Sequence, residues 1–187
     1  MTESEIISQS LRNNKEAQHL LFENHFSTMM CLSNRYAKDK TQAKEILNNG
    51  FGHILNNLSE FGKSDLSFDQ WSKEQFIEST IRFLKSKKNE YYITTTVRVS
   101  DNKNNADLFN SLDEFDASQI DGTELVYAIQ QLPPSFRAVY NMCMVDGFDF
   151  KKASELLEVS EDTAKFSLEK AGYHLHQNIR QLQKGYK

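Results

Sequence analysis

Residues 132–171 read LPPSFRAVYNMCMVDGFDFKKASELLEVSEDTAKFSLEKA, and this run decides the fold of the C-terminal part of the chain. Its spacing predicts three helices. Pro133 and Pro134 open the first one, because the first turn of a helix tolerates a residue without an N–H donor. Asp149 and Ser160 are good N-terminal caps, so we expect the second and third helices to begin just after them.

Each predicted helix has one apolar face. The faces consist of Val139, Tyr140 and Cys143 in the first helix, Phe150, Ala153, Leu156 and Leu157 in the second, and Ala164, Leu168, Ala171 and Leu175 in the third. Glu158 and Val159 are expected to turn the chain between the last two helices. The pattern predicts a helix-turn-helix, whose last helix normally enters the DNA major groove by its N-terminal end. An ordinary packed helical hairpin would show the same pattern.

The same forty residues resemble the fourth conserved region of the bacterial sigma-70 family, specifically its extracytoplasmic-function (ECF) group. The matching positions are Leu132, Pro133, Arg137, Gly147, Ser160, Thr163, Lys165, Leu168, Lys170 and Ala171. The resemblance implies a recognition helix that binds the minus-35 promoter element. The implied DNA-binding residues are Ser160, Thr163, Lys165, Phe166 and Lys170, with Arg137 from the first helix. Lys165 is placed nearer the groove and Lys170 nearer a phosphate, because residues five apart lie about 140° apart around a helix.

The N-terminal half resembles the second region of the same family, in the expected order. KEILNNGF at residues 44–51 is similar to the stretch that binds core RNA polymerase. FDQW at residues 68–71 and RFLKSKK at residues 82–88 are similar to the promoter-melting helix. Together the two resemblances cover most of the chain.

This second resemblance implies roles for three polar residues and one tryptophan. Glu45, Asn48 and Asn49 share one side of a predicted helix, and their family counterparts touch the clamp of the largest polymerase subunit. Trp71 matches a position near the flipped base of the minus-10 element. Without the resemblance, a solvated polar face is the preferred interpretation of Glu45, Asn48 and Asn49.

A basic cluster follows near the end of the promoter-melting helix. It consists of Arg82, Lys85, Lys87 and Lys88. These cations fit a surface that binds the DNA backbone, with Phe83, Tyr91 or Tyr92 available to stack on unpaired bases. They also fit the C-terminal end of a helix, where positive charge stabilises the helix dipole.

Four residues of the C-terminal run depart from the family pattern. Glu158 and Asp162 stand where the family usually has glycine, Ser167 stands where it often has arginine or glutamine, and Gly172 stands where it often has arginine. Because these changes add acids and omit cations near the expected DNA phosphates, we expect the C-terminal domain alone to bind DNA weakly.

The N-terminal domain is predicted to be an antiparallel helical bundle. Its apolar positions are Phe22, Phe26, Met29, Met30, Ser33 and Ala37 in one helix, and Ala43, Leu47, Phe51, Ile54, Leu58 and Phe61 in the next. Asp39 and Lys40 separate the two helices. Ser72 and Gln75 fit a capping box at the start of a third helix, which buries Ile77, Ile81 and Leu84.

An acidic stretch separates the two halves. It contains Asp107, Asp113, Glu114, Asp116, Asp121 and Glu124 and no lysine or arginine between residues 104 and 131. The predicted organisation is therefore all-α, with two small helical domains, 1–100 and 123–187, joined by an acidic linker, 101–122. The linker is either a solvated tether or, as the resemblance implies, a segment that occupies the RNA channel of the polymerase.

Composition narrows the remaining functional classes. The formal net charge is −4, and no apolar run approaches the roughly 20 residues of a membrane span. Cys31 and Cys143 are isolated in apolar contexts, so we expect buried thiols in a reducing, cytoplasmic compartment. The five histidines show no metal-binding spacing, and no motif indicates an enzyme or a cofactor.

The sequence predicts a sigma factor whose partners are core RNA polymerase, promoter DNA and an anti-sigma factor. The alternative is a sigma-like interaction protein that binds polymerase or an anti-sigma factor without recognising promoters. Run-off transcription separates these two hypotheses.

Overall fold

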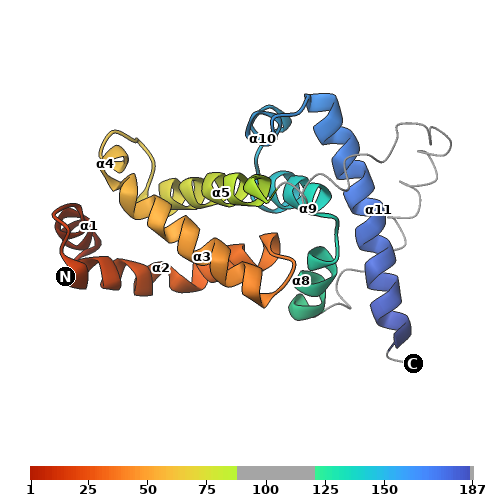
Figure 1. Ribbon diagram of the computed structural model, residues 1–187, viewed down its shortest axis with the longest axis horizontal. Coiled ribbons are helices and arrows are strands. Elements are labelled where there is room, and N and C mark those ends of the chain that lie inside the picture. The colour runs from red at the N-terminus through yellow and green to blue at the C-terminus, as the bar shows by residue number, and fades with distance from the viewer. Residues whose placement is uncertain (88–120, 186–187) are drawn as a thin grey trace. The chain divides into compact units, whose positions relative to one another are not determined.

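The computed structural model describes residues 1–87 and 121–185, and every regular element in these ranges is helical (Figure 1). The chain divides into two compact units, Met1–Ser86 and Lys87–Lys187. The predicted all-α fold is confirmed. The linker predicted at 101–122 lies outside the described residues except for its last two, so its boundaries stay a prediction.

The N-terminal unit contains five helices. They are α1 (Glu3–Leu11), α2 (Lys15–Tyr36), α3 (Lys40–Asn56), α4 (Leu58–Phe61) and α5 (Phe68–Ser86). Asp39 begins α3 by accepting a hydrogen bond from the Gln42 N–H at 2.8 Å, so the predicted break between the first two long helices is a capped helix start. The predicted second helix is interrupted at Asn57, where α3 ends and α4 begins.

Helix α5 begins one turn earlier than the sequence predicts. The residues that form the reciprocal cap are Ser67 and Gln70: the Gln70 N–H donates to Ser67 Oγ at 3.3 Å, and the Ser67 N–H donates to Gln70 Oε1 at 3.4 Å. The expected cap at Ser72 is wrong, because Ser72 lies buried inside the helix. Both sites have the same Ser-x-x-Gln pattern, and only the packing of Phe68 in the core favours the earlier one.

The close approach of α3 and α5 organises the N-terminal core. A Cβ atom added at Gly50 of α3 would lie 2.3 Å from the ring of Phe76 in α5, so the glycine allows the two helices to pack tightly. Ile77, Ile81 and Leu84 are buried, as the sequence predicts. Two expectations about α2 are wrong: Phe26 is 41% exposed, and Cys31 is exposed as well.

The C-terminal unit contains four α-helices and one π-helical turn among its described residues. They are α8 (Gly122–Gln130), α9 (Pro134–Tyr140), η2 (Asn141–Val145), α10 (Phe150–Leu157) and α11 (Glu161–Gly185). Pro133, Asp149 and Ser160 precede α9, α10 and α11, as the sequence predicts. Glu158 forms the turn between α10 and α11 with a left-handed backbone, φ 58° and ψ 45°.

The core of the C-terminal unit joins α8, α9 and α11. Its buried residues are Ala128, Ile129, Leu132, Phe136, Ala171, Leu175 and Ile179. The Asn178 side chain also donates a hydrogen bond to the Ala128 carbonyl at 3.0 Å, which ties α11 to α8. None of the helices in the described ranges is long and apolar enough to cross a membrane.

Candidate nucleic-acid and polymerase interfaces

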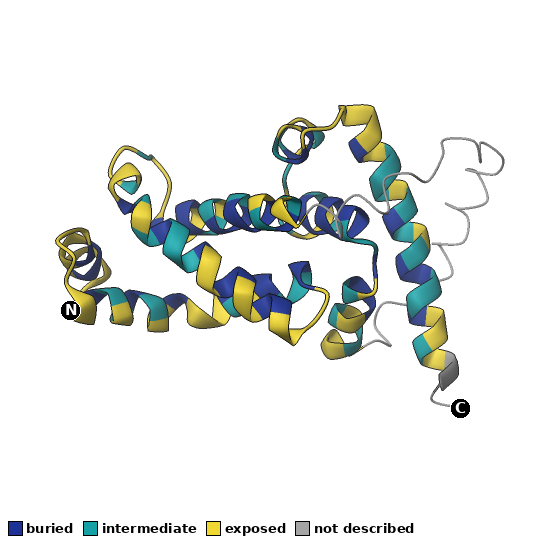
Figure 2. Cartoon of the chain, viewed as in Figure 1, coloured by how far each residue is buried: buried dark blue, intermediate teal, exposed yellow. Residues whose placement is uncertain are grey.

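The N-terminal end of α11 is the exposed end of the helix-turn-helix. Ser160, Thr163 and Lys165 are exposed there, and Figure 2 shows this end of α11 in yellow. Ser160 Oγ accepts a hydrogen bond from the Thr163 N–H at 3.1 Å and lies 2.8 Å from Thr163 Oγ1. The Ser160 hydroxyl thus caps the helix, and both hydroxyl groups lie on the surface that the resemblance assigns to DNA.

Aromatic rings support both lysines of the predicted recognition helix. Lys165 Nζ lies 5.8 Å from the centre of the Phe150 ring in α10, and Lys170 Nζ lies 5.4 Å from the centre of the half-buried Phe166 ring. Such cation–π contacts hold each lysine side chain against the face of a phenylalanine ring. Phe166 and Lys170 are four residues apart and therefore lie on the same side of α11, where they form a cation–π pair.

Acidic residues surround the same helix end. Glu161 and Asp162 occupy the first turn of α11, where negative charge stabilises the helix dipole. The Asp162 carboxylate lies 3.9 Å from Lys165 Nζ. The charge that Lys165 would offer to DNA is thus partly neutralised by a carboxylate of its own helix.

Arg137 does not lie on this surface. Its side chain is 2% exposed, and its guanidinium donates a hydrogen bond to the Gln130 carbonyl at the end of α8. A guanidinium in this position fixes α9 to α8 and cannot reach a phosphate without repacking the core. We therefore correct the sequence-based assignment and leave Arg137 out of the proposed DNA surface.

Trp71 also lies inside the protein. It is 5% exposed and packs with Phe61 and Phe68, whose ring centres lie 5.5 and 5.9 Å away. An indole enclosed by these rings has no open face on which a base can stack. Trp71 is therefore a core residue of the N-terminal unit, and its assignment as a direct DNA contact is corrected in the same way.

The basic cluster lies at the C-terminal end of α5. Arg82 and Lys87 are exposed and Lys85 is half-buried, while Lys88 lies outside the described residues. Arg82 is 3.8 Å from the Glu78 carboxylate, one turn earlier. The structure thus brings three of the four predicted cations to one helix end, and both interpretations of the cluster fit that position.

The predicted polymerase-binding residues form an exposed strip on α3. Glu45, Asn48 and Asn49 are all exposed, while Ile46 and Leu47 between them are buried. The Asn49 side chain donates to the Glu45 carbonyl at 3.1 Å, which turns it along the helix surface. The strip is thus a polar face whose opposite side is anchored in the core.

One cluster was not foreseen from the sequence. Glu3, His25 and Asp69 come from three different helices, and one ligand atom from each lies within 4.8 Å of the others. Because the three residues lie far apart in the sequence, they form no local motif that predicts the cluster.

The comparisons with known proteins give one family match, in the C-terminal unit, and one similar solved structure. Residues 123–175, which are 53 of the 187, match the family model described as sigma-70, region 4. The chain is also similar to a solved structure titled "Structure of CnrH in complex with the cytosolic domain of CnrY", with 14% sequence identity, 97% of each chain covered and a TM-score of 0.44. No curated protein sequence matches the chain. The family match covers α8, α9, η2, α10 and much of α11.

Proposed function

We propose that the chain is a sigma factor of the ECF type, which binds core RNA polymerase, directs it to promoters and helps to open the duplex. The observation that carries the proposal is the sigma-70 region 4 match, which falls on a helix-turn-helix with an exposed recognition-helix end. The function requires binding and duplex opening, and no covalent chemistry by this chain.

In this proposal α11 binds the minus-35 element. Ser160, Thr163 and Lys165 face the groove, and the Phe166–Lys170 pair lies beside the phosphates. Only two or three phosphate contacts are available, so the dissociation constant of the C-terminal unit alone is expected to be about 10⁻⁴ to 10⁻⁶ M. Binding to polymerase raises the effective concentration of the helix at the promoter.

The N-terminal unit supplies the other two contacts of the proposal. Glu45, Asn48 and Asn49 bind core polymerase through the exposed strip on α3. Arg82, Lys85 and Lys87, with Lys88, follow the DNA backbone near the minus-10 element. An anti-sigma factor completes the proposed set of partners, on the strength of the family resemblance.

Run-off transcription with purified core polymerase tests the proposal. The full chain is expected to direct defined transcripts from promoters that it occupies together with polymerase in cells. The double variant Lys165→Ala, Lys170→Ala is expected to lose most of this activity, because it removes both supported cations from α11. Arg180→Ala is the control, since it removes a cation from the same helix about 22 Å beyond Lys165 and about 15 Å beyond Lys170.

The second candidate is a sigma-like interaction protein without specific promoter binding. The acids at Glu158, Glu161 and Asp162 favour it, because all three are exposed around the recognition-helix end and repel phosphates. This candidate predicts polymerase binding with no promoter-specific transcript. Unchanged transcription in the double lysine variant would show that α11 does not read DNA.

A further inference from the structure

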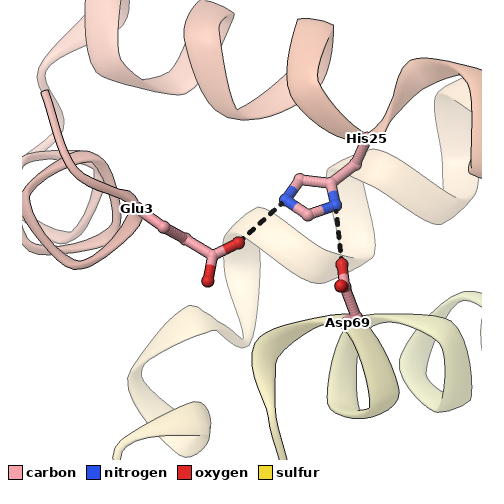
Figure 3. A group of neighbouring side chains, drawn as sticks. All are labelled: Glu3, His25 and Asp69. Carbon is pink, nitrogen blue, oxygen red and sulfur yellow. Dashed lines mark ion pairs between the residues drawn. The ribbon is translucent and has the colours of Figure 1, made fainter.

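A buried histidine lies between two carboxylates in the N-terminal unit. Glu3 belongs to the first turn of α1, His25 to the middle of α2 and Asp69 to the first turn of α5 (Figure 3). His25 Nε2 lies 3.6 Å from a Glu3 oxygen, and His25 Nδ1 lies 3.2 Å from an Asp69 oxygen. The imidazole ring is thus aimed at one carboxylate through each nitrogen.

The surroundings hold the ring in one orientation. The His25 side chain is only 10% exposed, and its ring packs edge-on against Phe68 with 5.0 Å between ring centres. The Asp69 oxygen lies 3.2 Å from Nδ1, so a proton on Nδ1 is next to a carboxylate. The tautomer that carries its proton on Nδ1 has its lone pair on Nε2.

His25 Nε2 is left without a hydrogen-bond partner among the described residues, although it is buried. In the tautomer that carries its proton on Nδ1, the Nε2 lone pair faces the carboxylate of Glu3, and two electron-rich atoms then face each other. A buried polar atom in this situation is costly unless a positive species lies between the two groups.

The spacing of these two atoms suits a metal ion. Two ligands at about 2.1 Å from a tetrahedral zinc ion are separated by about 3.4 Å. The observed separation of Nε2 and the Glu3 oxygen is 3.6 Å. The position of Asp69, 3.2 Å from Nδ1, matches the usual arrangement in which a carboxylate lies beside the other nitrogen of a metal-binding histidine.

We propose that Glu3 and His25 bind one divalent transition-metal ion of the zinc type, with Asp69 as the residue that positions the His25 ring. Imidazole with carboxylate favours zinc and its neighbours over magnesium or calcium. The Glu3 and Asp69 side chains are 57% and 80% exposed, so the ion can enter from solvent and water can complete its coordination. A bound ion would tie α1 to α2 and thereby stabilise the N-terminal unit.

Zinc chloride titration of the full chain tests the site, by calorimetry and by the melting temperature at neutral pH. The native chain is expected to bind one zinc ion with heat release and to melt at a higher temperature as zinc is added. Magnesium chloride is expected to leave the melting temperature unchanged. His25→Gln and Glu3→Gln are expected to abolish the response, and Asp69→Asn to weaken the affinity by about tenfold.

His19→Gln is the matched control. His19 lies on the same helix, 3.3 Å from Glu23, but this pair is exposed and forms no three-residue cluster of possible metal ligands among the described residues. The control is expected to bind zinc like the native chain. Because Glu3 is exposed, Glu3→Gln tests the site even if His25→Gln fails to fold. Zinc binding that survives Glu3→Gln, or the absence of a zinc-dependent rise in melting temperature, would overturn the proposal and leave a simple ion-pair cluster.

Discussion

At the scale of single residues, Glu158 is unfavourable in two ways in the turn of the helix-turn-helix: its backbone conformation destabilises the fold, and its charge opposes DNA binding. Its backbone is left-handed, which costs a residue with a side chain about 1 to 2 kcal/mol, and its carboxylate adds negative charge beside the recognition helix. Glycine adopts the same backbone without that steric cost. The position thus shows a local strain that packing of α10 and α11 compensates.

We expect Glu158→Gly to raise the free energy of unfolding by up to about 1 kcal/mol, since part of the steric gain is offset by the greater freedom of glycine in the unfolded chain. Glu158→Val, which branches at Cβ, is expected to lower it. Urea unfolding followed by circular dichroism measures both. A stable valine variant would contradict a left-handed turn at this position.

Two glycines on α3 provide a second residue-scale test. A Cβ at Gly50 would lie 2.3 Å from the Phe76 ring, whereas a Cβ at Gly52 would meet nothing within 4 Å. Gly50→Ala is therefore expected to destabilise the protein by about 1 to 3 kcal/mol through overpacking. Gly52→Ala is expected to stabilise it by up to about 1 kcal/mol, because alanine favours the helix.

The same unfolding measurement compares the two alanine variants. They differ only in position on one helix, so their helix propensity gain is shared and the difference reports the α3–α5 contact. Equal stabilities would mean that α3 and α5 do not approach closely at Gly50.

At the scale of elements, α11 contains a partly buried histidine, His174, whose protonation affects stability. Burial and, to a lesser extent, the charge of Lys170 lower the pKa of His174 from its usual value of 6.5. The unfolded chain therefore binds a proton at His174 more readily than the folded chain. The contribution of His174 to the free energy of unfolding is fully present above about pH 6.5 and is lost as the pH falls below that value. His53 in α3 acts in the same direction, because burial and Arg82 lower its pKa.

Urea unfolding at about pH 7.5 and about pH 5.5 is expected to show lower stability of the native chain at the acid pH. His174→Gln is expected to lose less stability over this range, because it removes one of the groups that take up protons on unfolding. An equal loss in both proteins would exclude His174 as a source of the acid sensitivity.

The acidic first turn of α11 makes a prediction about DNA affinity. Asp162→Asn removes the carboxylate that lies 3.9 Å from Lys165, so the charge of the lysine is more available to the DNA. We expect tighter promoter binding by the polymerase complex and a steeper log–log salt slope, because the variant removes one negative charge from the surface that faces the DNA. Fluorescence anisotropy at several salt concentrations measures both quantities.

Asp65→Asn is the control for Asp162→Asn, because it makes the same change in net charge at an exposed position of the N-terminal unit. The control is expected to leave the salt slope unchanged. A similar increase in both variants would indicate a general charge effect and would remove Asp162 as a modulator of Lys165.

At the scale of the whole molecule, the proposed function depends on binding to core polymerase through α3. Asn48→Lys is expected to weaken co-purification with core polymerase, because it places a cation in the middle of the exposed polar strip. Circular dichroism should show unchanged helix content, since Asn48 is exposed. Asn24→Lys adds the same charge at an exposed position on α2 and is expected to bind polymerase normally. Equal binding of both variants would exclude the strip as the interface.

Sequence alone was sufficient for the elements whose signals are local. Proline at a helix start, the caps at Asp149 and Ser160, and the apolar face of α11 act within a few residues, so the helix-turn-helix could be predicted from spacing. The family match to residues 123–175 confirms the resemblance that those positions carry.

The tertiary structure decided what depends on contacts between distant residues. Two Ser-x-x-Gln patterns compete for the start of α5, and only burial of Phe68 selects the first. Arg137 and Trp71 have side chains typical of DNA-binding surfaces, yet the packing of α8 against α9, and of Phe61 and Phe68 around Trp71, encloses them. The cluster of Glu3, His25 and Asp69 exists only because α1, α2 and α5 meet, a juxtaposition that helical spacing along one segment cannot encode.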